Sequence, residues 1–348
     1  MDKIQNGIQS LRSSPSYSGI TVVDAHTGGE PLRVIVDGFP QPEGKTILEK
    51  RRFLKTHYDH LRTAVMWEPR GHADMYGALI TEPETENGDL GVIFMHHEGY
   101  STMCGHGIIA LTRVVLELGL FEMVEPVTEL KIDTPAGQVV ARATIESGKV
   151  KSVSFENVPS FVTVLDQQID ISGLGKIQYD IAFGGAFYAF VDGEQLAIEP
   201  KPEFARTLID YGRRIKTEIM KQQEIVHPFE KDLSFLYGTI FTWPSDKKGI
   251  DSSNVCIFAE GELDRSPTGT GVSARLALEY AKGRLQANQP FTVESIIGSV
   301  FTGIIVDTVQ FGPHKAIIPQ IRGTASIIGI NELLIDADDS FKYGFFIR

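Results

Sequence analysis

The chain has 348 residues, of which 42% are hydrophobic and 22% charged, and its formal net charge is −12 at pH 7. This length predicts two domains, and the composition is that of a folded protein able to bury a core. The acidic balance, without any block of Lys or Arg, argues against nucleic acid or an anionic membrane surface as a partner.

The N-terminal segment, residues 1–18, lacks the apolar core of a signal peptide, and no run of the sequence is apolar enough to cross a bilayer. The sequence contains two cysteines, Cys104 and Cys256, which are too few for a disulfide framework. We therefore expect free thiols in a reducing compartment, a cytoplasmic location and no membrane partner.

Glycine-rich turns followed by apolar runs occur at two places in the chain. Thr-Gly-Gly at 27–29 precedes a mostly apolar segment at 32–36, and Phe-Gly-Gly at 183–185 precedes an apolar one at 187–191. Asp-Gly follows each segment. Both segments predict a turn, a strand and a second turn.

A second pair of matching segments follows. CGHGIIA at 104–110 and TGTGVSA at 268–274 are each closed by a glycine 15 positions after their first residue. Apolar residues between these markers fall at helical spacing, and the closing Gly119 and Gly283 stand where a C-terminal cap belongs. Each copy predicts a Gly-rich turn that opens a central helix.

The repeated order of these segments predicts a duplicated α+β architecture, with two pseudo-symmetric, strand-rich halves that each surround a central helix. We expect further strands at 139–145, 150–155, 252–258 and 304–309, and a surface helix at 203–223. A linker near 173–175 would divide the chain into a first half, residues 1–174 with Cys104, and a second half, residues 175–348 with Asp264 and Thr268.

Cys104 stands at the start of the first predicted central helix, inside a Gly-rich turn. The N–H groups and dipole of a helix N-terminus stabilise a thiolate, so we expect its pKa to fall from about 8.5 to somewhere within roughly 3.5–7.5. The same N–H groups can hold a substrate carboxylate, and Gly105 and Gly107 leave room for it. The alternative is that Cys104 is a small buried hydrophobic residue.

The second turn adds an acid, because Asp264 lies four residues before Thr268. If the two halves face each other, two helix N-termini meet at one cleft. Their N–H groups would bind a carboxylate, and Asp264 would accept a hydrogen bond from a substrate ammonium. The alternative is that Asp264 pairs with Arg265 or caps the turn.

Four motifs resemble those of a known family, the proline racemase family: DAHTGGEP at 24–31, EPRGH at 68–72, MCGHG at 103–107 and DRSPTGTG at 264–271. The resemblance runs from about Val22 to the end of the chain. It implies the diaminopimelate-epimerase-like fold with the active site between its halves, a small amino-acid substrate and a homodimer. It further implies that the substrate's carboxylate and amine are bound by Gly105, His106, Asp264, Gly269 and Thr270.

In the racemases and epimerases of this family each turn carries a Cys, one to take the α-proton and the other to deliver a proton to the opposite face. This sequence has Cys104 in the first turn and Thr268 at the second-base position. A threonine hydroxyl is too weak an acid or base near neutral pH to replace a thiol. The Thr variant is similar to the branch of the family that dehydrates trans-3-hydroxy-L-proline to Δ1-pyrroline-2-carboxylate.

The resemblance therefore implies a hydro-lyase that uses Cys104 as its base and needs no cofactor. A hydroxyproline epimerase or proline racemase of the same fold, and a non-catalytic amino-acid-binding protein, remain alternatives. Cys256 lies in an apolar strand pattern typical of a core thiol. Arg70 and His72 receive no role.

A metal site is not expected either. His96, His97 and Glu98 are the residue types that bind metals, but adjacent residues of a strand point to opposite faces and rarely ligate one ion.

Overall fold

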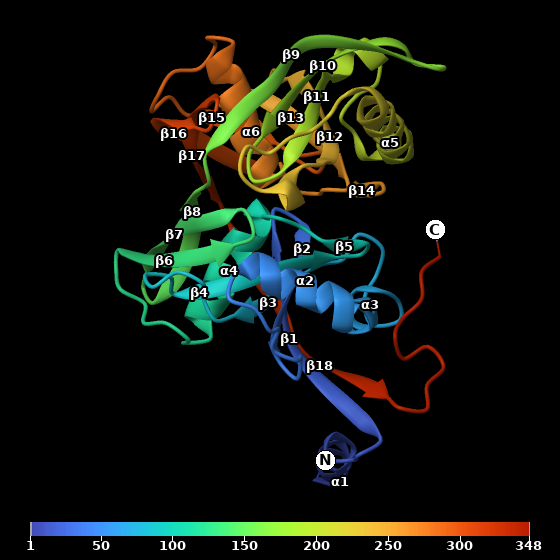
Figure 1. The fold of residues 1–348 in the computed structure, drawn as a ribbon. Helices are drawn as coiled ribbons and strands as arrows, with labels where there is room; N and C mark the ends of the chain where they lie inside the picture. Colours follow the sequence, from blue (N-terminus) through green and yellow to red (C-terminus); the bar gives the residue numbers. More distant parts are fainter. Residues whose placement is uncertain (1, 348) are drawn as a thin grey trace.

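The computed structural model describes residues 2–347, and its elements follow an order that occurs twice along the chain (Figure 1). The strands of the first repeat are β1 (Tyr17–Thr27), β2 (Glu30–Asp37), β3 (Tyr76–Thr81), β4 (Leu90–His96), β5 (Gly99–Tyr100), β6 (Val127–Thr134), β7 (Gly137–Glu146), β8 (Lys149–Glu156) and β9 (Ser160–Ile171). Its helices are α1 (Asp2–Arg12), α2 (Ile47–His57), α3 (Asp59–Met66) and α4 (Gly105–Glu117).

The strands of the second repeat are β10 (Gly175–Phe183), β11 (Phe187–Asp192), β12 (Leu236–Pro244), β13 (Ser252–Phe258), β14 (Glu262–Leu263), β15 (Phe291–Glu294), β16 (Val300–Phe311), β17 (His314–Gly323) and β18 (Ala325–Asp336). Its helices are α5 (Ala205–Gln222) and α6 (Gly269–Ala281), with short 3-10 turns at Gly193–Leu196, Pro202–Phe204 and Lys231–Leu233. The predicted strands and the predicted surface helix all have counterparts among these elements.

The pairing of the strands repeats in the same order. In the first repeat β2 pairs with β3, and β4 with β6, in parallel, whereas β1–β2, β3–β4, β6–β7 and β7–β8 are antiparallel. In the second repeat β11–β12 and β13–β15 are parallel, whereas β10–β11, β12–β13, β15–β16 and β16–β17 are antiparallel. The predicted duplication of an α+β unit is therefore confirmed.

The first repeat forms most of the lower body in Figure 1, and the second repeat forms most of the upper body. Each repeat also contributes its last strand to the body that the other repeat forms. β9 pairs with β10 and β17, and β18 pairs with β1 along its whole length. Figure 1 shows β9 rising into the upper body and β18 running beside β1 in the lower one. The segment expected to be a linker, near 173–175, is the turn of the β9–β10 hairpin. A domain boundary between residues 174 and 175 stays a prediction. It would separate the two repeats, but each body also contains one strand from the other side of that boundary.

The two central helices form as the apolar spacing predicts. α4 packs against β8, β1 and β18, and α6 packs against β9, β10 and β17. Ile108, Leu111 and Val115 of α4 are fully buried. The glycines that close the two copies, Gly119 and Gly283, have φ angles of 75° and 71°, the left-handed conformation that ends a helix at low cost only for glycine.

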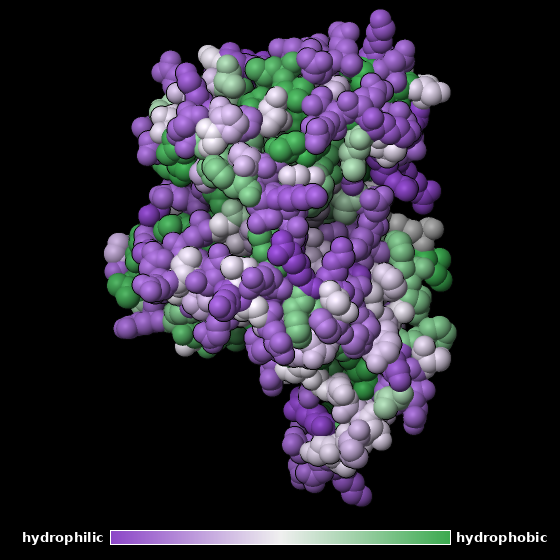
Figure 2. Space-filling model, in the orientation of Figure 1, coloured by the Kyte–Doolittle hydropathy of each residue, from purple (hydrophilic) through white to green (hydrophobic). Residues whose placement is uncertain are grey.

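The surface in Figure 2 is largely hydrophilic, with apolar side chains gathered at the right edge of the lower body. Helix α1 lies apart from both bodies, and none of its residues is buried (Figure 1). Within residues 2–347, no helix is both long and apolar enough to cross a membrane.

Candidate active site

Helices α4 and α6 begin against each other, between the two bodies. A Cβ atom added to Gly105 would lie 2.6 Å from the Cα atom of Gly269, and one added to Gly269 would lie 2.7 Å from the Cα atom of Gly105. Contacts this short to backbone atoms exclude any side chain at either position. The first N–H groups of a helix have no intrahelical partner, so this contact brings two sets of donors and two positive dipole ends together.

A small cavity lies at this junction. It is lined by residues of both repeats: Tyr76, Met103, Cys104, Gly105, His106, Tyr188, Tyr237, Phe258, Asp264, Thr268, Gly269 and Thr270. All seven residues that the sequence singled out for the site are among them. The cavity volume is about 20 Å³, which is room for about one water molecule.

Cys104 is the N-cap of α4, in an extended conformation with φ −142° and ψ 109°. Its Sγ accepts a hydrogen bond from the N–H of Gly107 at 3.2 Å, and Nδ1 of His106 lies 3.2 Å from Sγ. Both side chains are almost fully buried. The turn therefore presents one thiol and one imidazole in direct contact.

The protonation of this pair differs from the sequence-based expectation. Burial raises the pKa of the Cys104 thiol well above its usual range, while the Gly107 N–H lowers it and the charge of Asp264 raises it further. Burial lowers the pKa of His106. In the closed cavity desolvation outweighs the helix N-terminus, so the neutral thiol faces a neutral imidazole, and the expected fall of the Cys104 pKa does not occur.

Thr268 occupies the matching position in the second repeat but behaves differently. Its φ is 68°, its ψ is 95°, and its side chain makes no capping hydrogen bond to α6. Its hydroxyl donates instead to Oδ2 of Asp264 at 2.7 Å. A positive φ is uncommon for a β-branched residue, so the second turn is not a copy of the first in its backbone.

Asp264 both lines the cavity and braces its own turn. Its Oδ1 accepts from the N–H of Ser266 at 2.7 Å, and its side chain is buried. The guanidinium of Arg265 pairs with Asp74 at 3.2 Å and lies 3.7 Å from Glu30. Of the two structural alternatives for Asp264, the capping of the turn is therefore present, and Arg265 has other acidic partners.

The aromatic wall of the cavity, formed by Tyr76, Tyr188, Tyr237 and Phe258, was not found from the sequence. The hydroxyl of Tyr188 lies 2.7 Å from Oγ1 of Thr270, and the hydroxyl of Tyr76 donates to Oγ of Ser101 at 2.6 Å. These aromatic residues stand in ordinary strand patterns that carry no sign of a site. Only Tyr188 stands next to a feature that the sequence analysis used, because it lies in the strand that follows the second Gly-Gly turn.

Three further residues can now be placed. Arg70 donates through Nε to the carbonyl of Ala64 at 2.8 Å and also binds the carbonyl of Lys342, so it braces the C-terminal segment. His72 is exposed. Cys256 is 1% exposed in β13, where burial raises the pKa of its thiol and the adjacent Thr268 hydroxyl lowers it.

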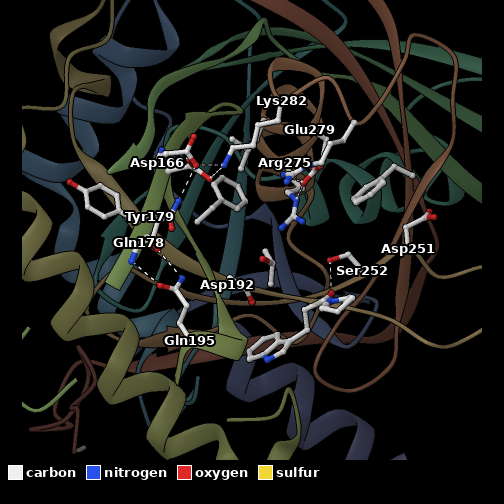
Figure 3. Close-up of a pocket in the computed structure, with 18 residues that line it drawn as sticks. Asp166, Gln178, Tyr179, Asp192, Gln195, Asp251, Ser252, Arg275, Glu279 and Lys282 are labelled. Carbon is white, nitrogen blue, oxygen red and sulfur yellow. Dashed lines mark hydrogen bonds and ion pairs between the residues drawn. The ribbon is translucent and has the colours of Figure 1, made fainter. Parts of the chain in front are cut away.

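A larger pocket, with a volume of about 580 Å³, lies in the upper body and is lined by other residues (Figure 3). Several of its charged side chains form ion pairs. Lys282 contacts Asp166 at 3.0 Å and Asp180 at 2.7 Å, and Glu279 lies 2.6 Å from Arg275. Because this pocket lies outside the cavity of Cys104 and none of its lining residues belongs to that cavity, it is not the candidate active site.

Known proteins resemble the chain over most of its length. The model of the proline racemase family matches residues 22–346. The trans-3-hydroxy-L-proline dehydratase of Colwellia psychrerythraea is 50% identical over 333 residues, which cover 96% of this chain and 94% of that protein. The human protein of the same name is 43% identical over 340 residues, covering 96% of each chain.

Solved structures of other proteins superpose on most of the chain. A hydroxyproline epimerase from Agrobacterium vitis, with bound trans-4-hydroxy-L-proline, superposes with a TM-score of 0.91 at 33% identity and covers 96% of each chain. A methylitaconate-delta-isomerase at 14% identity and a TM-score of 0.54 shares the fold. The duplicated fold and the cavity between its bodies thus define an enzyme of the diaminopimelate-epimerase-like class. Within that class, the chain belongs to the proline racemase family.

Proposed function

We propose that the protein is a hydro-lyase that dehydrates trans-3-hydroxy-L-proline to Δ1-pyrroline-2-carboxylate. The observation that carries this proposal is the asymmetry of the cavity, which has a thiol, Cys104, at one helix N-terminus and a hydroxyl, Thr268, at the other. The names of relatives that are 43–50% identical support the same substrate and reaction.

The substrate is an amino acid with two opposite charges, and the cavity has a counterpart for each. Its carboxylate binds the N–H groups that begin α4, at Gly105 and His106, and those that begin α6, at Gly269 and Thr270. Its ammonium donates to Asp264. This pairing also favours catalysis, because the ammonium offsets the Asp264 charge that raises the pKa of Cys104.

The base is formed by transfer of the Cys104 proton to Nδ1 of His106, the nitrogen 3.2 Å from Sγ. The thiolate then takes the α-proton, and the N–H groups around the carboxylate stabilise the negative charge that develops there. As the bond between C3 and its hydroxyl breaks, the hydroxyl leaves as water with a proton from this thiol–imidazole pair. The enamine that remains tautomerises to Δ1-pyrroline-2-carboxylate.

Stereochemistry explains why one thiol is enough. In the trans-3 isomer the hydroxyl is opposite the carboxylate, so the α-hydrogen and the hydroxyl share one face of the ring. Cys104 on that face serves both the proton abstraction and the departure of water. A second thiol at position 268 would serve only inversion of the α-carbon.

Every residue that lines the cavity is buried. The two bodies must therefore separate to admit the substrate, and their closure around it removes water and strengthens the electrostatic contacts.

Incubation with the full set of proline and hydroxyproline stereoisomers tests the proposal. We expect an imine that reacts with o-aminobenzaldehyde from trans-3-hydroxy-L-proline. Epimerisation of trans-4-hydroxy-L-proline without imine formation would favour the epimerase alternative, and binding without turnover of any isomer would favour an amino-acid-binding protein.

The surroundings of the enzyme are also proposals. A cytoplasmic location fits the two free, buried cysteines. The homodimer implied by the family is checked by light scattering on the purified protein.

A further inference from the structure

Outside the cavity, three potential metal ligands from the two repeats lie close together. β4 ends at His96, so His97 and Glu98 lie in the turn before β5 and not within a strand, while Glu262 begins β14. One ligand atom from each of His97, Glu98 and Glu262 lies within 4.8 Å of the others. The sequence-based argument against a metal assumed a strand, where neighbours point apart. The turn removes that objection.

Glu262 is the strongest sign that this cluster takes a ligand. Its side chain is fully buried, and its Oε2 has no hydrogen-bond partner among residues 2–347. Oε2 of Glu98 is likewise buried and without a partner in the described chain. The ion pairs of the described residues include none between a Lys or Arg and either carboxylate. Glu262 is buried and Glu98 half-buried, and the charge of Lys216 acts on Glu98 while its ion pair is with Glu260. Two adjacent carboxylates, one of them fully buried and neither in an ion pair with a Lys or Arg, are costly.

His96 does not supply the positive partner that Glu262 lacks. Its Nδ1 lies 3.2 Å from Oε1 of Glu262 and also receives the N–H of Glu98 at 3.3 Å. A ring nitrogen that accepts from an N–H has no proton to donate to a carboxylate. If Nδ1 accepts from the Glu98 N–H, it faces Oε1 of Glu262 without a proton between them, and that contact is repulsive. A positive charge beside Glu262 would offset this repulsion.

We propose that His97, Glu98 and Glu262 bind one divalent transition-metal ion of the Zn²⁺ type. One imidazole nitrogen and two carboxylate oxygens are a ligand set that such ions accept. The ion links the β4–β5 turn of the first repeat to β14 of the second.

The position of the cluster indicates a structural role for the ion. The His96 ring stacks on Tyr76, with ring centroids 5.7 Å apart, and meets Phe258 edge-on at 6.2 Å. Both partners belong to the aromatic wall of the cavity. The ion therefore holds that wall from behind and takes no part in proton transfer, and the proposal is independent of the proposed function.

The test is a Zn²⁺ titration of the Cys104→Ser protein, in which the Cys104–His106 pair cannot supply a competing thiolate site. We expect one Zn²⁺ per chain by elemental analysis after dialysis, and a melting temperature that rises with Zn²⁺ and returns on chelation. Less than about a tenth of an equivalent of bound Zn²⁺, with an unchanged melting temperature, would overturn the proposal without bearing on the dehydratase activity of the native protein.

Variants then locate the ion. Glu262→Gln and His97→Asn should each lower retained Zn²⁺ at least tenfold and abolish the Zn²⁺-dependent rise in melting temperature. Glu260→Gln is the matched control, since that side chain is two residues away and 72% exposed, and it should retain Zn²⁺ as the parent does. Equal retention by Glu262→Gln and Glu260→Gln would refute the assignment. Circular dichroism identifies misfolding of Glu262→Gln, in which case His97→Asn decides.

Discussion

Cys104 and Thr268 occupy equivalent places in the two repeats, yet their side chains are used differently. Cys104 caps its helix and touches His106 at 3.2 Å, whereas Thr268 turns its hydroxyl to Asp264 at 2.7 Å. The motifs were sufficient to find both residues, because Gly-rich turns and helical spacing are visible in the sequence. The positive φ of Thr268 and the raised pKa of Cys104 were not predictable, since both depend on what surrounds the turns in three dimensions.

The first prediction concerns the choice of thiol. Cys104→Ser keeps the size of the side chain but replaces the thiol by a much poorer base, so turnover should fall by about 10² to 10⁴ with the fold intact. Initial rates and a melting curve measure this. Cys256→Ser is the control and should retain most of the activity, because Cys256 is buried in β13 outside the cavity lining. Greater loss in Cys256→Ser than in Cys104→Ser would mean that the wrong thiol was chosen.

The second prediction concerns Asp264. Asparagine keeps one carbonyl oxygen but loses the charge and one of the two acceptors that hold Ser266 and Thr268. Because a buried donor is left poorly satisfied, unfolding free energy should fall by about 1–3 kcal/mol. If Asp264 also binds the substrate ammonium, kcat/KM should fall by a larger factor than the unfolded fraction explains. Thermal unfolding and kinetics on the same preparation separate the two effects. If the folded variant has the kcat/KM of the native protein, Asp264 only braces the turn and does not bind the substrate ammonium.

The third prediction concerns the missing second thiol. Native protein should not exchange or invert the α-hydrogen of trans-4-hydroxy-L-proline, which has no 3-hydroxyl to expel, whereas Thr268→Cys should do so at least slowly. Chiral chromatography in deuterated water reports both exchange and inversion. The cis-3 isomer, whose hydroxyl points toward Thr268, should be a poor substrate of the native protein. Efficient epimerisation by the native protein would contradict the one-base mechanism.

At the scale of secondary-structure elements, the sequence predicted which segments form helices and strands. It did not predict every pair of neighbouring strands. The closing glycines, the central helices and the strand after each Gly-Gly turn were correct because they follow from local periodicity. The exchange of β9 and β18 between the bodies was not predicted, and the expected linker near 173–175 proved to be a hairpin turn. Nothing in the alternation of a strand says which strand lies beside it, so such pairings need the tertiary structure.

The contact between the helix N-termini gives the fourth prediction. In Gly269→Ala the new Cβ would lie 2.7 Å from the Cα atom of Gly105, so α4 and α6 must move apart. We expect a lower melting temperature and a loss of activity of about 10²-fold, the scale of a 1 Å misplacement in an active site. The matched control is Gly7→Ala in helix α1, where nothing lies within 4 Å of the new atom. Normal activity in Gly269→Ala would show that the cavity does not depend on this contact.

For the molecule as a whole, the decisive interface is the one between the two bodies, and Glu30 connects them. This residue begins β2, is fully buried, and accepts through Oε2 from the N–H of Arg265 in the turn before α6, at 2.7 Å. Burial, and next the charge of Asp264, raise the pKa of Glu30 well above its usual 4.5. One contact between the two bodies is therefore made by a carboxyl group whose raised pKa favours its neutral form.

This gives a prediction about stability and pH. A carboxyl whose pKa is raised by folding contributes stability that is fully present below its unfolded pKa, near 4.5, and is lost as the pH rises through its folded pKa. Glu30→Gln stays neutral at every pH and can still accept from the Arg265 N–H. The unfolding free energy of the variant minus that of the native protein should therefore increase with pH, and this difference cancels the groups that titrate alike in both. Denaturant melts at several values between about pH 5 and pH 9 measure it. A difference that stays constant over that range would mean that Glu30 does not change its protonation there, and a difference that falls would mean that its charge is needed at the interface.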